Sequence, residues 1–298
     1  MVASRITPRV VLFGLAINIG AWLTVHLPSM AGMTPRLRMT ERVLKAVFLC
    51  LAYALALVLN LEIAAEYKQA RWLRVAWLAM AANAGLSILR ILVESPLISL
   101  QQPGTPRNWM PGLLQHLTIV PANIFLLIGL VAMWQAYHQV GLGFTIERRD
   151  YLAIGGIFLL TCALLFFREG LSESQSPYLV SRYLQLFGLV LLSLSAAAGL
   201  VLHRMAMQMG GGKLAVALRF LTFYTLLRAV LVFLQALQRL DITDFNQLYR
   251  FHDLVMEMGW QIVPWIAALA AAYRAELIVQ AAEKLAQQRA ARATLVSA

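Results

Sequence analysis

Long apolar runs alternate with short polar stretches along the whole chain. Eight such runs cover approximately residues 9–27, 43–60, 73–93, 112–136, 151–167, 183–203, 214–237 and 254–273. Each run is close to the roughly 20 residues that a helix needs to cross the hydrocarbon core of a bilayer. A spanning backbone must satisfy its own hydrogen bonds, and the runs are too long for barrel strands. The pattern therefore predicts an all-α, polytopic membrane helix bundle with about eight transmembrane helices.

The amino-acid composition excludes some classes of function. Of the 298 residues, 60% are apolar and 13% are charged, whereas a soluble domain carries about 25% charged residues. The polar stretches between the runs are too short for a soluble catalytic domain, and no catalytic or phosphate-binding motif is present. Cys50 and Cys162 both fall inside apolar runs, where a thiol acts as a small apolar filler. We expect a protein that is not an enzyme, with no cofactor and no metal site.

The distribution of basic residues predicts the orientation of the bundle. The N-terminus, the alternate loops 61–74, 137–150 and 204–219, and the C-terminal tail carry 14 of the 25 Lys and Arg residues. The positive-inside rule then places both termini in the cytoplasm of a plasma (inner) membrane; the basic 28–45 loop argues the other way. The net charge of +11 favours anionic membrane lipids as partners and does not indicate nucleic acid.

The first apolar run allows two interpretations. Arg5 and Arg9, the apolar stretch 10–25 and the small residues 29–31 have the order of a cleavable signal peptide. The run is long and contains Asn18 and Trp22, which favours a retained helix.

Three short matches indicate an internal repeat. Residues 42–45 match 182–185, residues 87–93 match 225–231, and residues 119–121 match 262–264. The offsets pair each span with the span four further on, which predicts a tandem duplication of two parallel four-helix units. The expected units are residues 1–140 and 141–273, followed by a polar helical tail over 274–298.

The third match gives a role to two prolines. Pro121 and Pro264 occupy corresponding positions in the fourth and eighth runs. A proline removes one backbone hydrogen bond and can kink a helix, and matched kinks mark the binding site in many transporter folds. Proline is also common in membrane helices for purely structural reasons.

A few ionisable residues inside the runs are the candidate ligand-binding cluster. Arg228 lies within the seventh run, and Glu257, with Asp253 one turn away, is its nearest expected partner at the outer side. This pair can serve structure alone, or it can anchor an anionic ligand. Arg90 is the repeat counterpart of Arg228, and His116 maps to the same outer side. Two arginines in the outer half suit a carboxylate, a phosphate or a lipid headgroup.

The C-terminal tail leads to the functional expectation. The helix pattern runs from the eighth span to about residue 295 without Gly or Pro. Such a continuous helix is typical of sensors that relay motion to a cytoplasmic signalling partner, or that form homo-oligomers through the tail; a helix that only caps the bundle is the plainer alternative. We therefore expect a receptor-like sensor that binds a small anionic or lipidic ligand in its outer half. The alternative is a transporter or channel with a substrate site between two four-helix repeats.

Overall fold

A computed structural model describes residues 6–30, 35–99, 109–141, 147–171, 179–238 and 246–297. All the regular structure in these ranges is helical. The helices are α1 (Pro8–Met30), α2 (Pro35–Glu66), α3 (Arg71–Ser99), α4 (Trp109–Gln139), α5 (Arg148–Leu171), α6 (Leu179–Gln208), α7 (Lys213–Gln238) and α8 (Asn246–Ser297). Each apolar run of the sequence lies inside one of them, so the all-α prediction is confirmed.

Among the described residues, seven helices are long and apolar enough to cross a membrane. The segments that meet this criterion of length and composition are Pro8–His26, Thr40–Glu66, Arg71–Val93, Leu117–Gln139, Leu186–Gln208, Lys213–Val232 and Val255–Gln288. The chain is therefore a polytopic membrane protein. Helix α5, which contains the predicted span 151–167, is not among the seven. Several of its side chains, those of residues 161, 162 and 164–171, lie outside the described residues. The eighth span remains a prediction.

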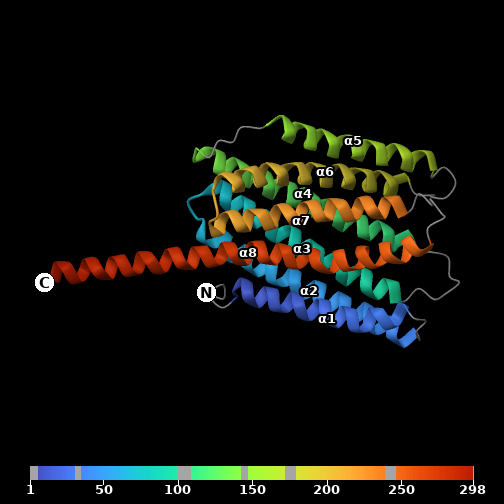
Figure 1. The fold of residues 1–298 in the computed structure, drawn as a ribbon, viewed down its shortest axis with the longest axis horizontal. Helices are drawn as coiled ribbons and strands as arrows, with labels where there is room; N and C mark the ends of the chain where they lie inside the picture. The colour runs from blue at the N-terminus through green and yellow to red at the C-terminus, as the bar shows by residue number, and fades with distance from the viewer. Residues whose placement is uncertain are drawn as a thin grey trace.

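Six helices form a closed ring in which each packs against the next. The order is α2, α3, α4, α6, α7 and α8, and α8 closes the ring on α2. Helix α1 packs outside the ring on α2 and α8, and α5 packs outside it on α6 and α7. The two outer helices lie at opposite edges of the bundle (Figure 1). We call the end where α1 begins and α8 leaves the bundle the tail end, and the opposite end the distal end.

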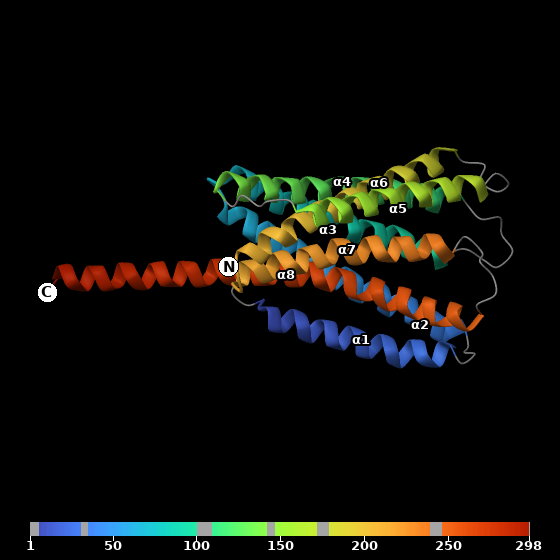
Figure 2. The same ribbon diagram turned by 45° about the horizontal axis from the view of Figure 1, so that its top comes forward.

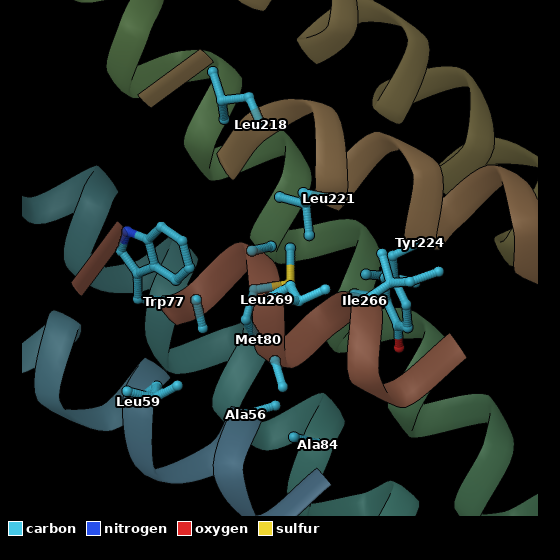
Figure 3. Packing of buried hydrophobic residues seen from close by; sticks show 14 of the residues in the cluster. Ala56, Leu59, Trp77, Met80, Ala84, Leu218, Leu221, Tyr224, Ile266 and Leu269 are labelled. Carbon is cyan, nitrogen blue, oxygen red and sulfur yellow. The ribbon is translucent and has the colours of Figure 1, made fainter. Parts of the chain in front are cut away.

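The apolar core lies where α2, α3, α7 and α8 face one another. Trp77 and Met80 of α3 meet Leu221 and Tyr224 of α7 beside Leu269 of α8 (Figure 3). All five side chains are at most 5% exposed. Leu59 of α2 belongs to the same cluster (Figure 3), so side chains from four ring helices fill this volume.

Glycines set the closest helix contacts. A methyl group added at Gly14 of α1 would overlap the ring of Trp265 of α8, and one added at Gly259 of α8 would lie 2.5 Å from the Leu231 side chain of α7. Helix α6 packs against α7 at Gly199, where the Thr222 hydroxyl donates to the Gly199 carbonyl at 2.9 Å. Small residues let helix backbones approach closely, which is how membrane helices gain packing energy.

A polar contact anchors the start of α5 to α6. The Arg204 Nε donates to Asp150 Oδ1 at 2.5 Å, and the Glu147 N–H donates to Asp150 Oδ2 at 2.9 Å. Burial by itself raises the pKa of Asp150, but these two hydrogen bonds and the Arg204 charge outweigh it and hold the pKa below its usual value. The carboxylate is therefore ionised at neutral pH and fixes the tail end of α5.

Helix α8 is much longer than the other helices. It has 52 residues, and its last part extends alone beyond the rest of the bundle in both views (Figures 1 and 2). Side chains 280–288 are all exposed. The predicted helical tail therefore continues α8 without a break.

Candidate functional site

A hydrogen-bonded network of four buried side chains crosses the middle of the ring. We call Asn83, Asn123, Tyr224 and Arg228 the central network. Arg228 donates from Nη1 to the Tyr224 hydroxyl and from Nη2 to Asn123 Oδ1, both at 2.8 Å. The Tyr224 hydroxyl donates to Asn83 Oδ1 at 2.9 Å. The network thereby joins α3, α4 and α7.

Backbone carbonyls complete the two ends of the central network. Asn83 Nδ2 donates to the Ala122 carbonyl of α4 at 2.7 Å, and Asn123 Nδ2 donates to the Gly188 carbonyl of α6 at 3.4 Å. Both amides therefore use a donor and an acceptor. All four side chains are buried. A buried polar network in which the members are satisfied makes a unique arrangement of the helices more stable than its alternatives.

The expected pair of Arg228 with Glu257 does not form. Arg228 is 6% exposed and hydrogen bonds only neutral groups of the described structure. Glu257 pairs instead with Lys45 of α2. The reason is the helix face: Arg228 points across the ring toward α4, whereas Glu257 faces α2. Sequence proximity and opposite charge were not enough to identify the partner.

A second group of polar side chains lies in the distal half, between α1, α2 and α8. We call it the distal cluster, and it contains a histidine–carboxylate contact and an ion pair. His26 Nδ1 lies 2.5 Å from Glu41 Oε1, and Lys45 is bonded to Glu257. The Trp22 ring stacks on His26 with centroids 4.4 Å apart. Its other members are Asn18 and Gln261.

The distal cluster contains buried polar atoms that have no hydrogen-bond partner. These are Asn18 Oδ1, Trp22 Nε1 and both amide atoms of Gln261, and the Asn18 and Gln261 residues are each 1% exposed. The one bond between them is from Asn18 Nδ2 to the Gln261 backbone carbonyl at 3.4 Å. Each such atom costs about 1–3 kcal/mol of desolvation if it stays unpaired. The site therefore offers two hydrogen-bond donor groups and two hydrogen-bond acceptors to a ligand.

A small cavity joins these atoms. It has a volume of about 10 Å³ and is lined by Asn18, Trp22, Glu41, Lys45 and Gln261, among others. That is at the lower limit for a single water. A ligand larger than a water requires α1 to move outward. Because α1 packs on two helices, α2 and α8, it is the helix of this site with the fewest contacts to break.

Another small cavity lies on the tail side of the central network. It is about 20 Å³, is lined by Asn60, Trp77, Asn83 and Tyr224 among others, and has room for one water. Asn60 Oδ1 and Trp77 Nε1 are buried without a partner. The volume is too small for a ligand larger than a single water.

The two prolines adjoin the two polar sites. Pro121 lies inside α4 and immediately precedes Ala122 and Asn123 of the central network. Pro264 lies inside α8, three residues after Gln261 of the distal cluster. Each removes one backbone hydrogen bond from its helix. Both sites therefore lie where the helix backbone is weakest.

Three contacts hold α8 at the tail end; we call them the clasp. Lys213 Nζ lies 2.6 Å from Glu276 Oε1. The Tyr273 ring stacks on Phe220 with centroids 5.5 Å apart. The Arg274 guanidinium lies 5.3 Å from the centre of the Tyr67 ring. The clasp ties α8 to the start of α7 and to the α2–α3 turn at the point where the tail begins.

The remaining predicted residues are Arg90, His116 and Asp253. Arg90 lies on α3, two turns beyond Asn83, with its Nε buried. Its charge interacts with Tyr224 of the central network, although the hydrogen bonds described above do not include it. His116 and Asp253 lie in α4 and α8, but their side chains are outside the described residues. In the parts of the chain that are described, no cluster of three metal-ligating side chains occurs.

The sequence interpretation followed charges and missed the amides. Asn83, Asn123 and Gln261 are each at most 3% exposed, and each carries a large part of one polar site. An amide inside an apolar run was the available signal, because a buried polar group requires partners as a charge does.

Comparison of the chain with protein families, with curated proteins and with solved structures finds no match, so the site is interpreted from its geometry alone.

Proposed function

We propose that this chain is a receptor-like membrane sensor and not an enzyme. A small polar ligand binds at the distal cluster, and α8 relays binding to the polar tail. In this proposal the tail end faces the cytoplasm of an inner membrane, as the distribution of basic residues predicts, and the distal end faces outward.

One observation carries the proposal. Helix α8 supplies Glu257 and Gln261 to the distal cluster and continues as a single helix through the clasp into the exposed tail. A ligand shifts an equilibrium only if it binds two states with different affinity. Unpaired amide atoms on α8 supply that difference, because a guest that satisfies them favours one position of α8 over another.

The chemistry of the distal cluster limits the ligand. The side chains offer the Trp22 N–H and the Gln261 amide as donors, and Asn18 Oδ1 and Gln261 Oε1 as acceptors. Two carboxylates, those of Glu41 and Glu257, adjoin the site. A small neutral or cationic molecule with both donors and acceptors fits this set better than the anion that the two arginines of the sequence suggested.

The relay is tested by measuring the position of the tail. Spin labels replace Leu285 in the tail and Gly211 in the α6–α7 turn, both exposed, in a background with Cys50 and Cys162 changed to Ser. Ethanolamine, glycine amide and acetate are added in turn to the protein in nanodiscs. We expect ethanolamine or glycine amide, and not acetate, to change the distance between the labels measured by pulsed electron resonance.

The matched control is the same labelled protein with Gln261→Met. This variant removes the unpaired amide at nearly constant volume and should abolish the change in distance. A change that persists in Gln261→Met contradicts the site. If the probes bind to the wild-type protein and the distance stays constant, the relay is wrong.

A transporter is the second candidate, and the ring favours it. The six contacts of the ring form three pairs related by a shift of four helices: α2–α3 corresponds to α6–α7, α3–α4 to α7–α8, and α4–α6 to α8–α2. This correspondence supports the tandem duplication that the sequence matches suggest. It fails at the outer helices, since α1 contacts α8 whereas α5 contacts α7.

Flux measurements separate the two candidates. In liposomes, a transporter moves radiolabelled ethanolamine or glycine amide across the membrane, and Pro264→Ala slows that movement because it restores the missing backbone hydrogen bond of α8. Ligand binding without flux favours the sensor.

A further inference from the structure

Arg274 is a buried cation at the base of α8 without a counter-ion among the described residues. It is 7% exposed, and its Nε has no hydrogen-bond partner. Its one contact of defined geometry is with the Tyr67 ring. The nearest carboxylate in sequence, Glu276, is already paired with Lys213. The other buried arginine, Arg228, differs because neutral side chains satisfy it.

A buried guanidinium of this kind requires an anion. Removing a charge from water costs several kcal/mol unless a partner of opposite sign and further hydrogen bonds replace the lost hydration. The ring of Tyr67 supplies only a cation–π contact, which does not replace the lost hydration. Hydrogen-bonding capacity at Nε is left over, and a planar guanidinium binds phosphate oxygens through two parallel N–H donors.

We propose that Arg274 is the centre of a phosphate-binding site at the tail end of the bundle. The ligand is a phosphate group, either on the headgroup of an anionic phospholipid or free in solution. The proposal rests on Arg274 and its surroundings and does not depend on the sensor function.

The surroundings of Arg274 support an anion over a cation. Tyr67 belongs to the α2–α3 turn, where Lys68 follows it directly and Arg71 opens α3, both exposed. Glu66 precedes Tyr67 and is the acid of this turn. Basic pockets between membrane helices on the cytoplasmic side are a recurrent binding mode for phospholipid headgroups. The site lies at the level of the clasp, two residues from Glu276, so an occupied site adds a contact that holds α8 to the α2–α3 turn.

The test compares three probes with purified full-length protein. Phosphatidylglycerol, phosphatidylcholine and inorganic phosphate are titrated separately, and bound lipid is counted by native mass spectrometry. The midpoint of thermal unfolding is recorded in parallel. The variants are Arg274→Gln, Arg274→Lys, and Arg219→Gln as the matched control, because Arg219 is an exposed arginine of the neighbouring α7.

We expect phosphatidylglycerol to raise the unfolding midpoint of the wild-type protein and Arg274→Gln to weaken its binding by about tenfold or more. Arg219→Gln should leave binding within about twofold, since exposed charge contacts contribute little. Phosphatidylcholine should bind more weakly, because its headgroup has no net charge. If inorganic phosphate competes with the lipid and stabilises the protein alone, the ligand of the site is free phosphate.

Equal phosphatidylglycerol binding to the wild-type protein and Arg274→Gln overturns the proposal. If Arg274→Gln does not fold, Arg274→Lys decides: it keeps the charge and loses the two parallel donors, so binding should fall, and unchanged binding is contrary to recognition by the guanidinium.

Discussion

The central network and the distal cluster are both polar, both buried in a membrane bundle, and differ in how completely they are satisfied. In the central network, Tyr224, Asn83 and Asn123 each have hydrogen-bond partners within the protein. In the distal cluster, the Asn18 oxygen, the Trp22 N–H and the whole Gln261 amide have none. A satisfied network contributes to the fold, whereas an unsatisfied one retains capacity for a ligand. The difference assigns stability to one site and binding to the other.

The largest loss of stability is expected from Asn123→Leu. This change leaves Arg228 Nη2 without its acceptor, and an unpaired buried charged donor is costly. It also removes the side-chain hydrogen bond to the Gly188 carbonyl of α6. We expect a loss of about 2–3 kcal/mol in the free energy of unfolding, measured with denaturant in micelles. Tyr224→Phe should cost about 2 kcal/mol, because it leaves Arg228 Nη1 without its acceptor and removes the hydrogen bond to Asn83 Oδ1. Tyr151→Phe, at an exposed tyrosine, is the control and should be neutral.

An intermediate loss is expected where α1 covers the distal cluster. Gly14→Ala places a methyl group against Trp265, and overpacking costs about 1–3 kcal/mol. The variant should also expose the distal end of α1 to protease before the ring unfolds. Gly20→Ala in the same helix meets no atom within 4 Å and serves as the control. Equal behaviour of the two variants would show that α1 is not held at Gly14.

The smallest effect on stability is expected from Gln261→Met. The amide has no side-chain partner to lose, so its removal should change the free energy of unfolding by less than about 1 kcal/mol, and in the stabilising direction. The measurement is the same denaturant titration. A loss as large as that of Tyr224→Phe would contradict the assignment of binding to the distal cluster, since it would mean that the distal amide already supports the fold.

The sequence predicted the helices well for a physical reason. Apolar length is a property of one segment, and all eight runs lie within helices. The predicted ends were shorter than the structure shows, as in α2, whose polar first turns from Pro35 continue the helix before the apolar run at 43. The hydropathy pattern indicates where the chain leaves the hydrocarbon core of the membrane. The helices continue beyond that boundary.

The candidate site was predicted less well because it depends on which helix faces meet. Arg228 and Glu257 were identified as unusual residues, but each found its partner on a helix that sequence order does not specify: Asn123 on α4 and Lys45 on α2. Opposite charge did not predict the hydrogen-bond partners of Arg228, because these partners are neutral. The order of the ring, which brings α8 beside α2, arises from tertiary packing and is not encoded in any single run.

The length of α8 determines what kind of protein partner can bind the tail. From Glu276 to Ser297 the helix rises by about 30 Å at 1.5 Å per residue, several times the depth of a headgroup layer. Figure 2 shows this part leaving the bundle as a straight projection. A globular partner of ordinary size can therefore stand beside the tail wholly in water, without touching lipid or displacing any loop. Such a partner would respond to a rotation or tilt of a single helix, the tail of α8. The membrane surface would not restrict the shape of the partner.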